Sequence, residues 1–156
     1  MYSKNAVRKN VWCAVIILIL LLLSTPVQSE VHHSQDINED FSWNATQVHV
    51  VDSDINVSKG ASLHLEPGAV VKFASNVELE VDGELQVNGT AEDKVYLTSL
   101  KDDSVGGDTN GDGNETTPAP GNWDQVHFTD DSSGNLKHGI FRYGGGSYGN
   151  DAVLSI

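Results

Sequence analysis

One short stretch of the sequence carries residues suited to holding a metal ion. Asp108, Asn110 and Asp112 recur at every second position and Gly113 follows them, as in the first half of a D-x-[DN]-x-D-G calcium loop. Side-chain oxygens at this spacing can converge on one hard cation, and glycine permits the sharp turn. The carbonyl of Asn114 would add a ligand. The sequence therefore predicts a Ca²⁺ site at Asp108, Asn110, Asp112 and Asn114.

This stretch departs from an EF-hand, because the twelfth position is Ala119 instead of a bidentate Glu and no helical pattern flanks the loop. Further oxygens would have to come from nearby acidic residues, for which the candidates are Asp102, Asp103, Glu115 and Asp124. The competing interpretation is an ordinary surface turn, because Asp, Asn, Gly and Thr are common turn residues.

Four N-x-[ST] sequons could accept glycans if the protein is exported by a cell that glycosylates such chains. They lie at Asn44, Asn56, Asn88 and Asn114. A chain rich in Ser, Thr and Asn also generates such sequons by chance.

The sequence offers few groups for acid–base catalysis. Arg142 is the only arginine after residue 29, and a strand with Phe141 and Tyr143 inward would point it outward, with His127 on a neighbouring coil of the chain. No carboxylate cluster accompanies this candidate base, so we predict no catalytic residue. By the same period His49, His64 and His127 face outward, and His32 and His33 are expected in solvent.

The first 29 residues have the layout of a secretory signal peptide. A basic start with Lys4, Arg8 and Lys9 precedes an apolar run at 11–23 and then small residues. That run is shorter than the roughly 20 residues that span a bilayer, so we expect no membrane span in the mature chain. Cys13 is the only cysteine, so the mature chain has no disulfide, thiol catalysis or cysteine zinc site.

The charge balance excludes one class of partner. Removal of residues 1–29 takes away three basic residues and no acidic one, so the formal charge changes from −13 to −16. Such a surface repels nucleic acid, and it favours cations or solubility in a salty exterior.

After residue 47 the apolar residues alternate with polar ones, which is typical of half-buried β-strands. The residues predicted to face inward are Ile55, Val57, Leu63, Leu65, Val71, Phe73, Val77, Leu79, Val81, Leu85, Val87, Val95, Leu97, Val126 and Phe128. Leu63 matches Leu85 at an offset of 22, and Val71 matches Val95 at an offset of 24. A repeat of this length made only of short strands favours a solenoid over an antiparallel sandwich.

The domain organisation follows from these patterns. We expect a signal peptide at 1–29, an N-terminal cap segment at 30–46, and a parallel β-helix at 47–156 with a long loop insertion at 99–122, which Trp123 closes as an anchor. The strand pattern continues to the last residue, so we expect an amino-terminal part of a longer protein, or an end covered by a partner or by end-to-end self-association.

Four blocks resemble secreted right-handed parallel β-helix proteins of bacteria and archaea, in the pectate-lyase-like superfamily. They are "SKGASLHLEPGAVVKF", "VDGELQVNGTAEDKVYLTSLKDD", "GGDTNGDGNETTPAPGNWDQVHF" and "SSGNLKHGIFRYGG". The resemblance implies an all-β right-handed parallel β-helix, and one departure is Gly139, where the group usually has an apolar residue.

That fold hosts enzymes, adhesins and inert repeats alike, so it does not fix a function. We expect a secreted or cell-surface module with a structural, adhesion or glycan-binding role, non-catalytic and calcium-stabilised, with polysaccharide or cell-envelope components as partners. The alternative is the N-terminal part of a carbohydrate-active enzyme, a polysaccharide lyase or glycoside hydrolase, whose active site lies beyond residue 156.

Overall fold

The computed structural model describes residues 28–146 and 153–155, and these residues form only strands, turns and loops. The predicted signal peptide lies outside the described residues except for Gln28 and Ser29. Within the described part of the chain, no helix has the length and apolar character needed to cross a bilayer.

The strands form three sheets in which every pairing is parallel. The five-stranded sheet has the order β1 (Ser29–His33), β3 (Gln47–Val51), β6 (Val70–Phe73), β9 (Val95–Ser99) and β12 (Gly139–Phe141). One four-stranded sheet has the order β13 (Leu154–Ser155), β10 (Val126–Phe128), β7 (Leu79–Val81) and β4 (Ile55–Val57). The other has the order β11 (Ser133–Lys137), β8 (Glu84–Asn88), β5 (Ser62–Leu65) and β2 (Phe41–Trp43).

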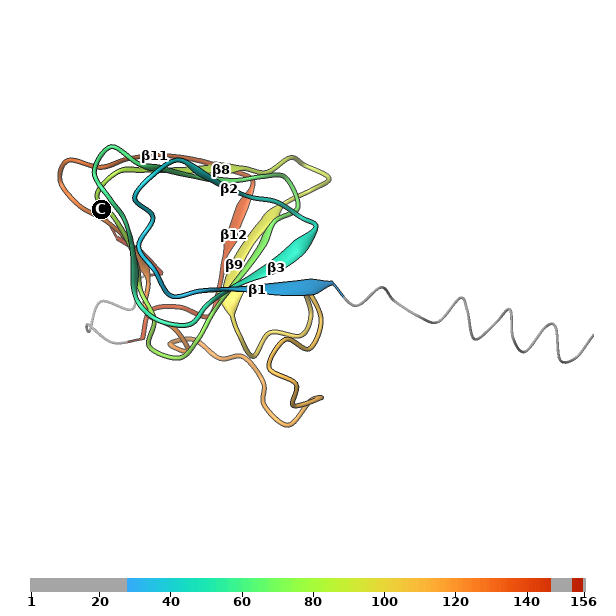
Figure 1. Cartoon of the computed structure of the whole chain (residues 1–156). Coiled ribbons are helices and arrows are strands. Elements are labelled where there is room, and N and C mark those ends of the chain that lie inside the picture. Colours follow the sequence, from blue (N-terminus) through green and yellow to red (C-terminus); the bar gives the residue numbers. More distant parts are fainter. Residues whose placement is uncertain (1–27, 147–152, 156) are drawn as a thin grey trace, which may run out of the picture.

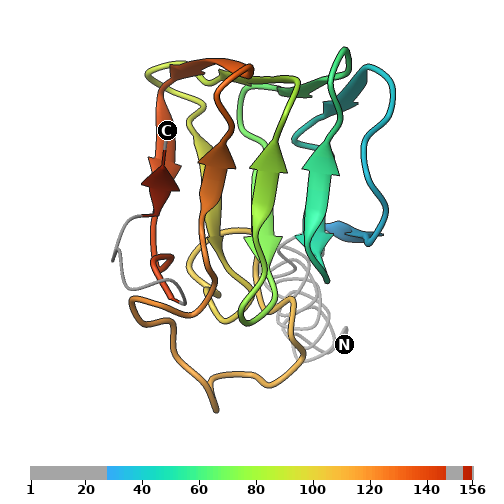
Figure 2. The same cartoon turned by 90° about the vertical axis from the view of Figure 1, so that its left-hand side faces the viewer.

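From β2 onward the chain visits the three sheets in turn, so each strand pairs with the strand three elements later. Figure 1 looks along the stack and shows the sheets around a common interior. Figure 2 shows β4, β7, β10 and β13 side by side and pointing the same way. The fold is therefore all-β, with three parallel sheets around one core.

The core confirms the period-two prediction. Every residue predicted to face inward, from Ile55 to Phe128, is buried in a single hydrophobic cluster. Burying one face of each strand against the other two sheets supplies most of the driving force for folding, at about 25 cal/mol per Å² of apolar surface.

The strand register confirms one predicted repeat and corrects the other. Leu63 pairs with Leu85, which is the predicted offset of 22. Val71 pairs with Leu97 instead of Val95, because the connection between β8 and β9 is longer than the one between β5 and β6. The difference of two residues leaves the same side chains inward, so the sequence pattern alone does not reveal it.

The segment 30–46 contributes strands to the sheets. β1 pairs with β3, β2 pairs with β5, and Trp43 is 3 % exposed. At the other end of the stack, a Cβ atom on Gly139 would lie 2.8 Å from a ring carbon of Phe141. The ring of Phe141 therefore occupies the space that an apolar side chain at position 139 would fill.

Candidate functional site

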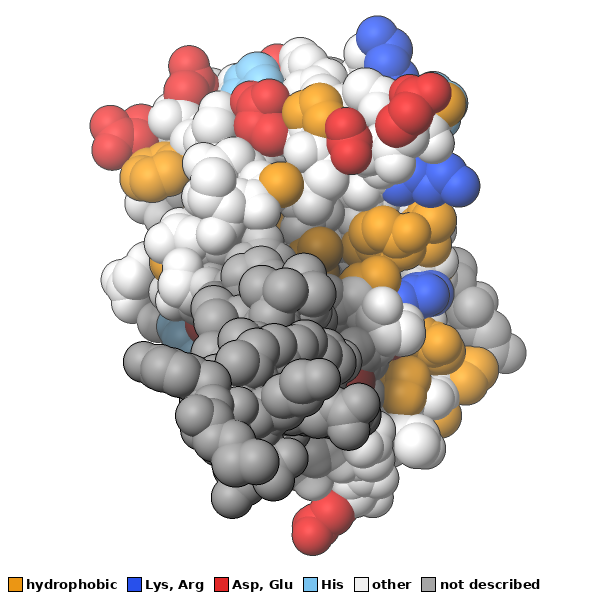
Figure 3. All heavy atoms as spheres, turned by 90° about the vertical axis from the view of Figure 1, so that its right-hand side faces the viewer, with side chains coloured by type: hydrophobic (Ala, Val, Ile, Leu, Met, Phe, Trp, Pro, Cys, Tyr) orange, Lys and Arg blue, Asp and Glu red, His pale blue; other side chains and the backbone are white. Residues whose placement is uncertain are grey.

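The long connection between β9 and β10 contains no strand, and it lies against the outer face of the five-stranded sheet. Val48, Val50 and Val70 form a second hydrophobic cluster there, against which Leu100 and Val105 of the loop pack. Figure 3 views this side of the molecule, and hydrophobic side chains gather in its right-hand half, below carboxylates along the upper edge. The loop therefore covers an apolar outer surface of the sheet.

Lys72 attaches the long loop to the outer face of the five-stranded sheet. It projects from β6 to the outer face, as the strand period predicts, yet it is 0 % exposed. Its Nζ donates hydrogen bonds to the carbonyl oxygen of Gly107 (2.6 Å) and to the hydroxyl of Thr109 (2.7 Å). Burial lowers the pKa of Lys72, while the charges of Asp103 and Asp102 act in the opposite direction.

Asp102 ties the start of the loop to the sheet. Its side chain is 1 % exposed and lies 2.5 Å from Nη2 of Arg142. Hydroxyls of Thr98 (2.6 Å) and Ser104 (2.7 Å) donate to the same carboxylate. Burial acts to raise the pKa of Asp102, but the hydrogen bonds from Ser104 and Thr98 and the charge of Arg142 outweigh it and lower that pKa.

The surroundings of Arg142 bear on its candidate role as a base. Its guanidinium lies over the rings of Tyr96 and Tyr143, at 5.3 and 5.4 Å from their centroids, and pairs with Asp102. His127 belongs to β10 in another sheet. The geometry does not bring Arg142 and His127 onto one face, and it favours a structural role for Arg142.

Asp103, Asp108 and Asp112 converge beside Lys72, with one carboxylate oxygen of each lying within 4.8 Å of the others. The backbone wraps around Asp108, whose carboxylate accepts hydrogen bonds from the amides of Asp112 (3.1 Å) and Gly113 (2.8 Å). Gly113 has a φ of 74°, a conformation that glycine adopts without strain. The predicted turn therefore forms, with its carboxylates on one side.

Three oxygens of this cluster are buried without a hydrogen-bond partner among the described residues. They are Oδ1 of Asp103, Oδ1 of Asn110 and Oδ1 of Asp112. The amide of Asn110 donates to Oδ2 of Asp112 at 2.7 Å, which leaves its own Oδ1 as an unpaired acceptor. Buried polar atoms in folded proteins almost always have a partner.

The charges of the cluster repel one another. Burial, followed by the charge of Asp108, raises the pKa of Asp103, and the nearby Lys72 only partly offsets this. A bound dication would satisfy the three free oxygens and remove the repulsion. Carboxylate and amide oxygens are the donors that Ca²⁺ prefers, so the residues present fit this ion.

The structure brings together three of the four predicted ligands. Asp108, Asn110 and Asp112 lie together, and Asp103 joins them among the candidate additional residues. Asn114 is exposed, and the contribution of its backbone carbonyl stays a prediction. The contribution of Lys72 was missed, because a lysine at an outward strand position looks like a solvated residue.

Two predictions about histidine are wrong. His49 is 4 % exposed, not outward, and its ring stacks on Trp43 at a centroid distance of 5.0 Å. His33 is half-buried, and its ring stacks on the rings of Trp43 and His49. The sequence around position 49 is apolar on both sides, and because the loop covers Val48 and Val50, it is His49 that takes the inward position.

Trp123 has the predicted anchoring role where the loop rejoins the stack. It is 0 % exposed, its ring stacks on Phe73 at a centroid distance of 4.2 Å, and its Nε1 donates to the carbonyl of Arg142 at 2.9 Å. Burial of a large aromatic ring at this point fixes the return of the chain.

The four sequons differ in accessibility. Asn44 and Asn114 are exposed, whereas Asn56 and Asn88 are half-buried within strands. Asn56 also donates a hydrogen bond of 2.7 Å to Asp82. Accessibility therefore favours Asn44 and Asn114 as acceptors.

Comparison with known proteins gives one partial similarity. No family model and no solved structure matches this chain. A segment of 62 residues is 36 % identical to Protein bark beetle of Drosophila melanogaster. This segment covers 40 % of this chain and 2 % of that protein. The chain thus spans a very small part of the length of this curated relative.

Proposed function

We propose that the chain is a right-handed parallel β-helix that serves as an exported or cell-surface module in adhesion, glycan binding or envelope architecture. The repeated visit to three parallel sheets supports the helix, and parallel crossovers are right-handed in nearly all proteins. The signal-like start and the acidic composition support export. The resemblance to the pectate-lyase-like superfamily agrees with the proposed β-helix and with the proposed export.

The module's long loop binds Ca²⁺ through Asp103, Asp108, Asn110 and Asp112. The observation that carries this proposal is the set of three buried and unpaired oxygens that accompany the convergent carboxylates. The ion would order the loop over Val48, Val50 and Val70 and so stabilise the face that the loop covers. It has a structural role in this proposal and takes part in no reaction.

Calorimetric titration of the metal-free chain with Ca²⁺ tests the site. We expect binding of one ion, and a rise in melting temperature of about 5–10 °C at a hundredfold excess over the Kd. Replacing Asp108→Asn together with Asp112→Asn should abolish both effects. The melting temperature in EGTA should fall, because an asparagine at position 108 can accept only one of the two backbone hydrogen bonds, so the test is the loss of the difference between Ca²⁺ and EGTA within this variant. Asp40→Asn, an exposed carboxylate remote from the loop in sequence, is the matched control. Absence of binding heat from the wild-type chain would refute the site.

Export and binding are tested separately. Expression in a cell that secretes proteins should yield a mature chain beginning at Glu30, as read by mass spectrometry; an intact Met1 would contradict the signal peptide. The mature chain should bind insoluble envelope polysaccharide without releasing product. Release of unsaturated sugars from polygalacturonate would instead favour the polysaccharide-lyase alternative.

A further inference from the structure

A second group of metal-ligating side chains lies on the outer face of the sheet β13-β10-β7-β4, away from the long loop. His127 of β10 is in register with Glu80 of β7, and Glu80 with Asn56 of β4. Glu78 lies two residues before Glu80 and therefore shares its face. Because neighbouring strands are about 4.8 Å apart, the side chains of Asn56, Glu80 and His127 lie in one row across β4, β7 and β10.

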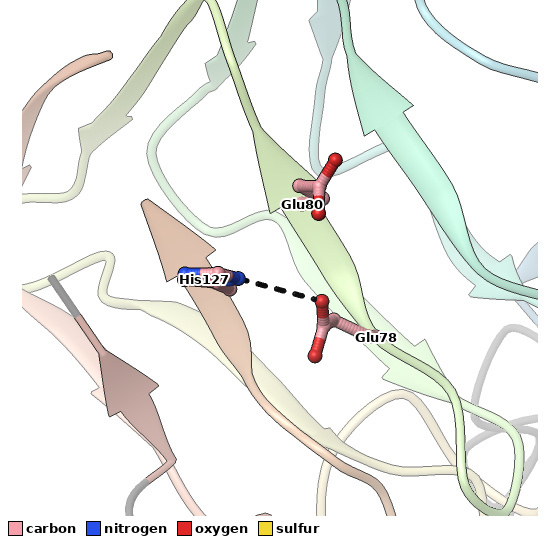
Figure 4. Close-up of side chains that lie close together, drawn as sticks. All are labelled: Glu78, Glu80 and His127. Atoms are coloured by element: carbon pink, nitrogen blue, oxygen red, sulfur yellow. Dashed lines mark ion pairs between the residues drawn. The ribbon is translucent and has the colours of Figure 1, made fainter. Parts of the chain in front are cut away.

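The ligand atoms of Glu78, Glu80 and His127 all lie within 4.8 Å of one another. Figure 4 shows the three side chains on this face, with Nδ1 of His127 lying 3.7 Å from Oε1 of Glu78. Gln125 donates a hydrogen bond of 2.9 Å to Oε2 of Glu78, which leaves Oε1 on the side of the imidazole. Such outer contacts orient ligands in metal sites.

A separate observation is a pocket beside the two glutamates, whose lining among the described residues contains no lysine or arginine. Glu78 and Glu80 line a pocket of about 200 Å³ whose other polar walls are Asp36, Asp54, Asn56 and Asp124. Asp124 is 6 % exposed, and its Oδ1 is buried with no hydrogen-bond partner among the described residues. Oδ1 of Asn56 is unpaired in the same way. Buried acceptors without donors, in a pocket of carboxylates, favour a cationic ligand.

We propose that Glu78, Glu80 and His127 bind a divalent transition-metal ion such as Zn²⁺. An imidazole with two carboxylates suits zinc and its neighbours in the first row, whereas Ca²⁺ and Mg²⁺ prefer oxygen ligands only. This donor set distinguishes the sheet site from the all-oxygen loop cluster. The metal would cross-link β7 and β10, which are neighbours in this sheet.

Titration with Zn²⁺ in the presence of saturating Ca²⁺ tests the site while any calcium site in the loop stays filled. We expect one zinc ion per chain, with binding at least about tenfold weaker in His127→Ala and in Glu80→Gln. His64→Ala is the matched control, because His64 is also half-buried on an outer strand face but belongs to the sheet β11-β8-β5-β2. This variant should retain wild-type affinity.

Two results would overturn the proposal. One is the absence of zinc binding to the wild-type chain, and the other is wild-type affinity in His127→Ala, which would place the ion elsewhere, for example at His32. Thermal melting monitored by circular dichroism shows whether each variant is folded. If His127→Ala is unfolded, His127→Asn provides the same test with a smaller change in polarity.

Discussion

The ammonium group of Lys72 donates a hydrogen bond of 2.6 Å to the carbonyl oxygen of Gly107, although the two residues lie 35 positions apart. This contact joins a strand of the five-stranded sheet to the long loop. It also places a buried positive charge beside the carboxylates of Asp103 and Asp108. The attachment of the loop and the electrostatics of the candidate cation site are therefore coupled.

Lys72→Met keeps most of the side-chain volume but removes the charge and both hydrogen bonds. We expect a loss of about 2 kcal/mol in the free energy of unfolding, because hydrogen bonds to charged groups contribute about 1.5–3 kcal/mol each and relief of the buried charge offsets part of this. Urea denaturation measures the change. The exposed Lys94→Met should stay within about 0.5 kcal/mol of wild type, and an equal effect of both substitutions would refute the role of Lys72.

Gly106 and Gly107 separate steric contact from backbone strain. Both have positive φ angles, of 68° and 79°, but a Cβ on Gly106 would lie 2.8 Å from Cγ2 of Val48, while a Cβ on Gly107 would meet nothing within 4 Å. Gly106→Ala should therefore destabilise the protein by about 1–3 kcal/mol more than Gly107→Ala. The two urea curves measure this difference. If the substitutions prove equivalent, the loop does not pack closely on Val48.

The stacked rings of His33, Trp43 and His49 predict acid sensitivity. Nε2 of His49 donates to the carbonyl of Asn44 (3.1 Å), so its Nδ1 accepts from Nε2 of His33 (3.1 Å) and the ring of His49 is neutral. Burial, followed by the charge of His49, lowers the pKa of His33 from 6.5 to about 4. Burial also lowers the pKa of His49.

Between about pH 4 and pH 6.5, His33 therefore binds more protons in the unfolded chain than in the folded chain. The contribution of His33 to stability is complete above about pH 6.5 and is lost as the pH falls to about 4. The charge of Asp52 acts against this shift of the pKa of His33, and that of His32 adds to it. His33→Phe keeps the stack but removes the proton, so its urea midpoint should fall less than that of wild type between these pH values. His64→Phe should follow wild type; a wild-type pH profile for His33→Phe would contradict this account.

Limited proteolysis reports on the order of the loop. Lys101 is the only trypsin site between β9 and β10, and cleavage there requires local opening of the chain. If calcium orders the loop, trypsin should cut after Lys101 several times faster in EGTA than in Ca²⁺. In Asp108→Asn with Asp112→Asn the two rates should be equal. Mass spectrometry of the fragments measures the cleavage rate. A wild-type rate that does not change with Ca²⁺ would count against calcium control of the loop.

The inward positions of the strands were predictable because alternation is a local property. Leu63, Leu65, Leu85 and Val87 each follow the period of an extended chain, and burial of one face selects them. Leu63 and Leu85 occupy paired positions on β5 and β8, so their offset of 22 is the length of one passage of the chain around the three sheets. The offset of 24 failed because the pattern specifies which face a side chain takes but not how many residues a turn contains.

The sequence by itself determined the period-two strands, the position of the long loop and the alternate oxygens of Asp108, Asn110 and Asp112. Only the tertiary structure decided what the loop covers. That contact buries Val48, Val50 and Lys72 on an outer face and places His49 inside, and it brings Asp103 to Asp112. The pairing of β7 with β10 likewise places Glu80 beside His127. These outcomes depend on contacts between residues distant in the chain, whose burial and charge no local pattern records.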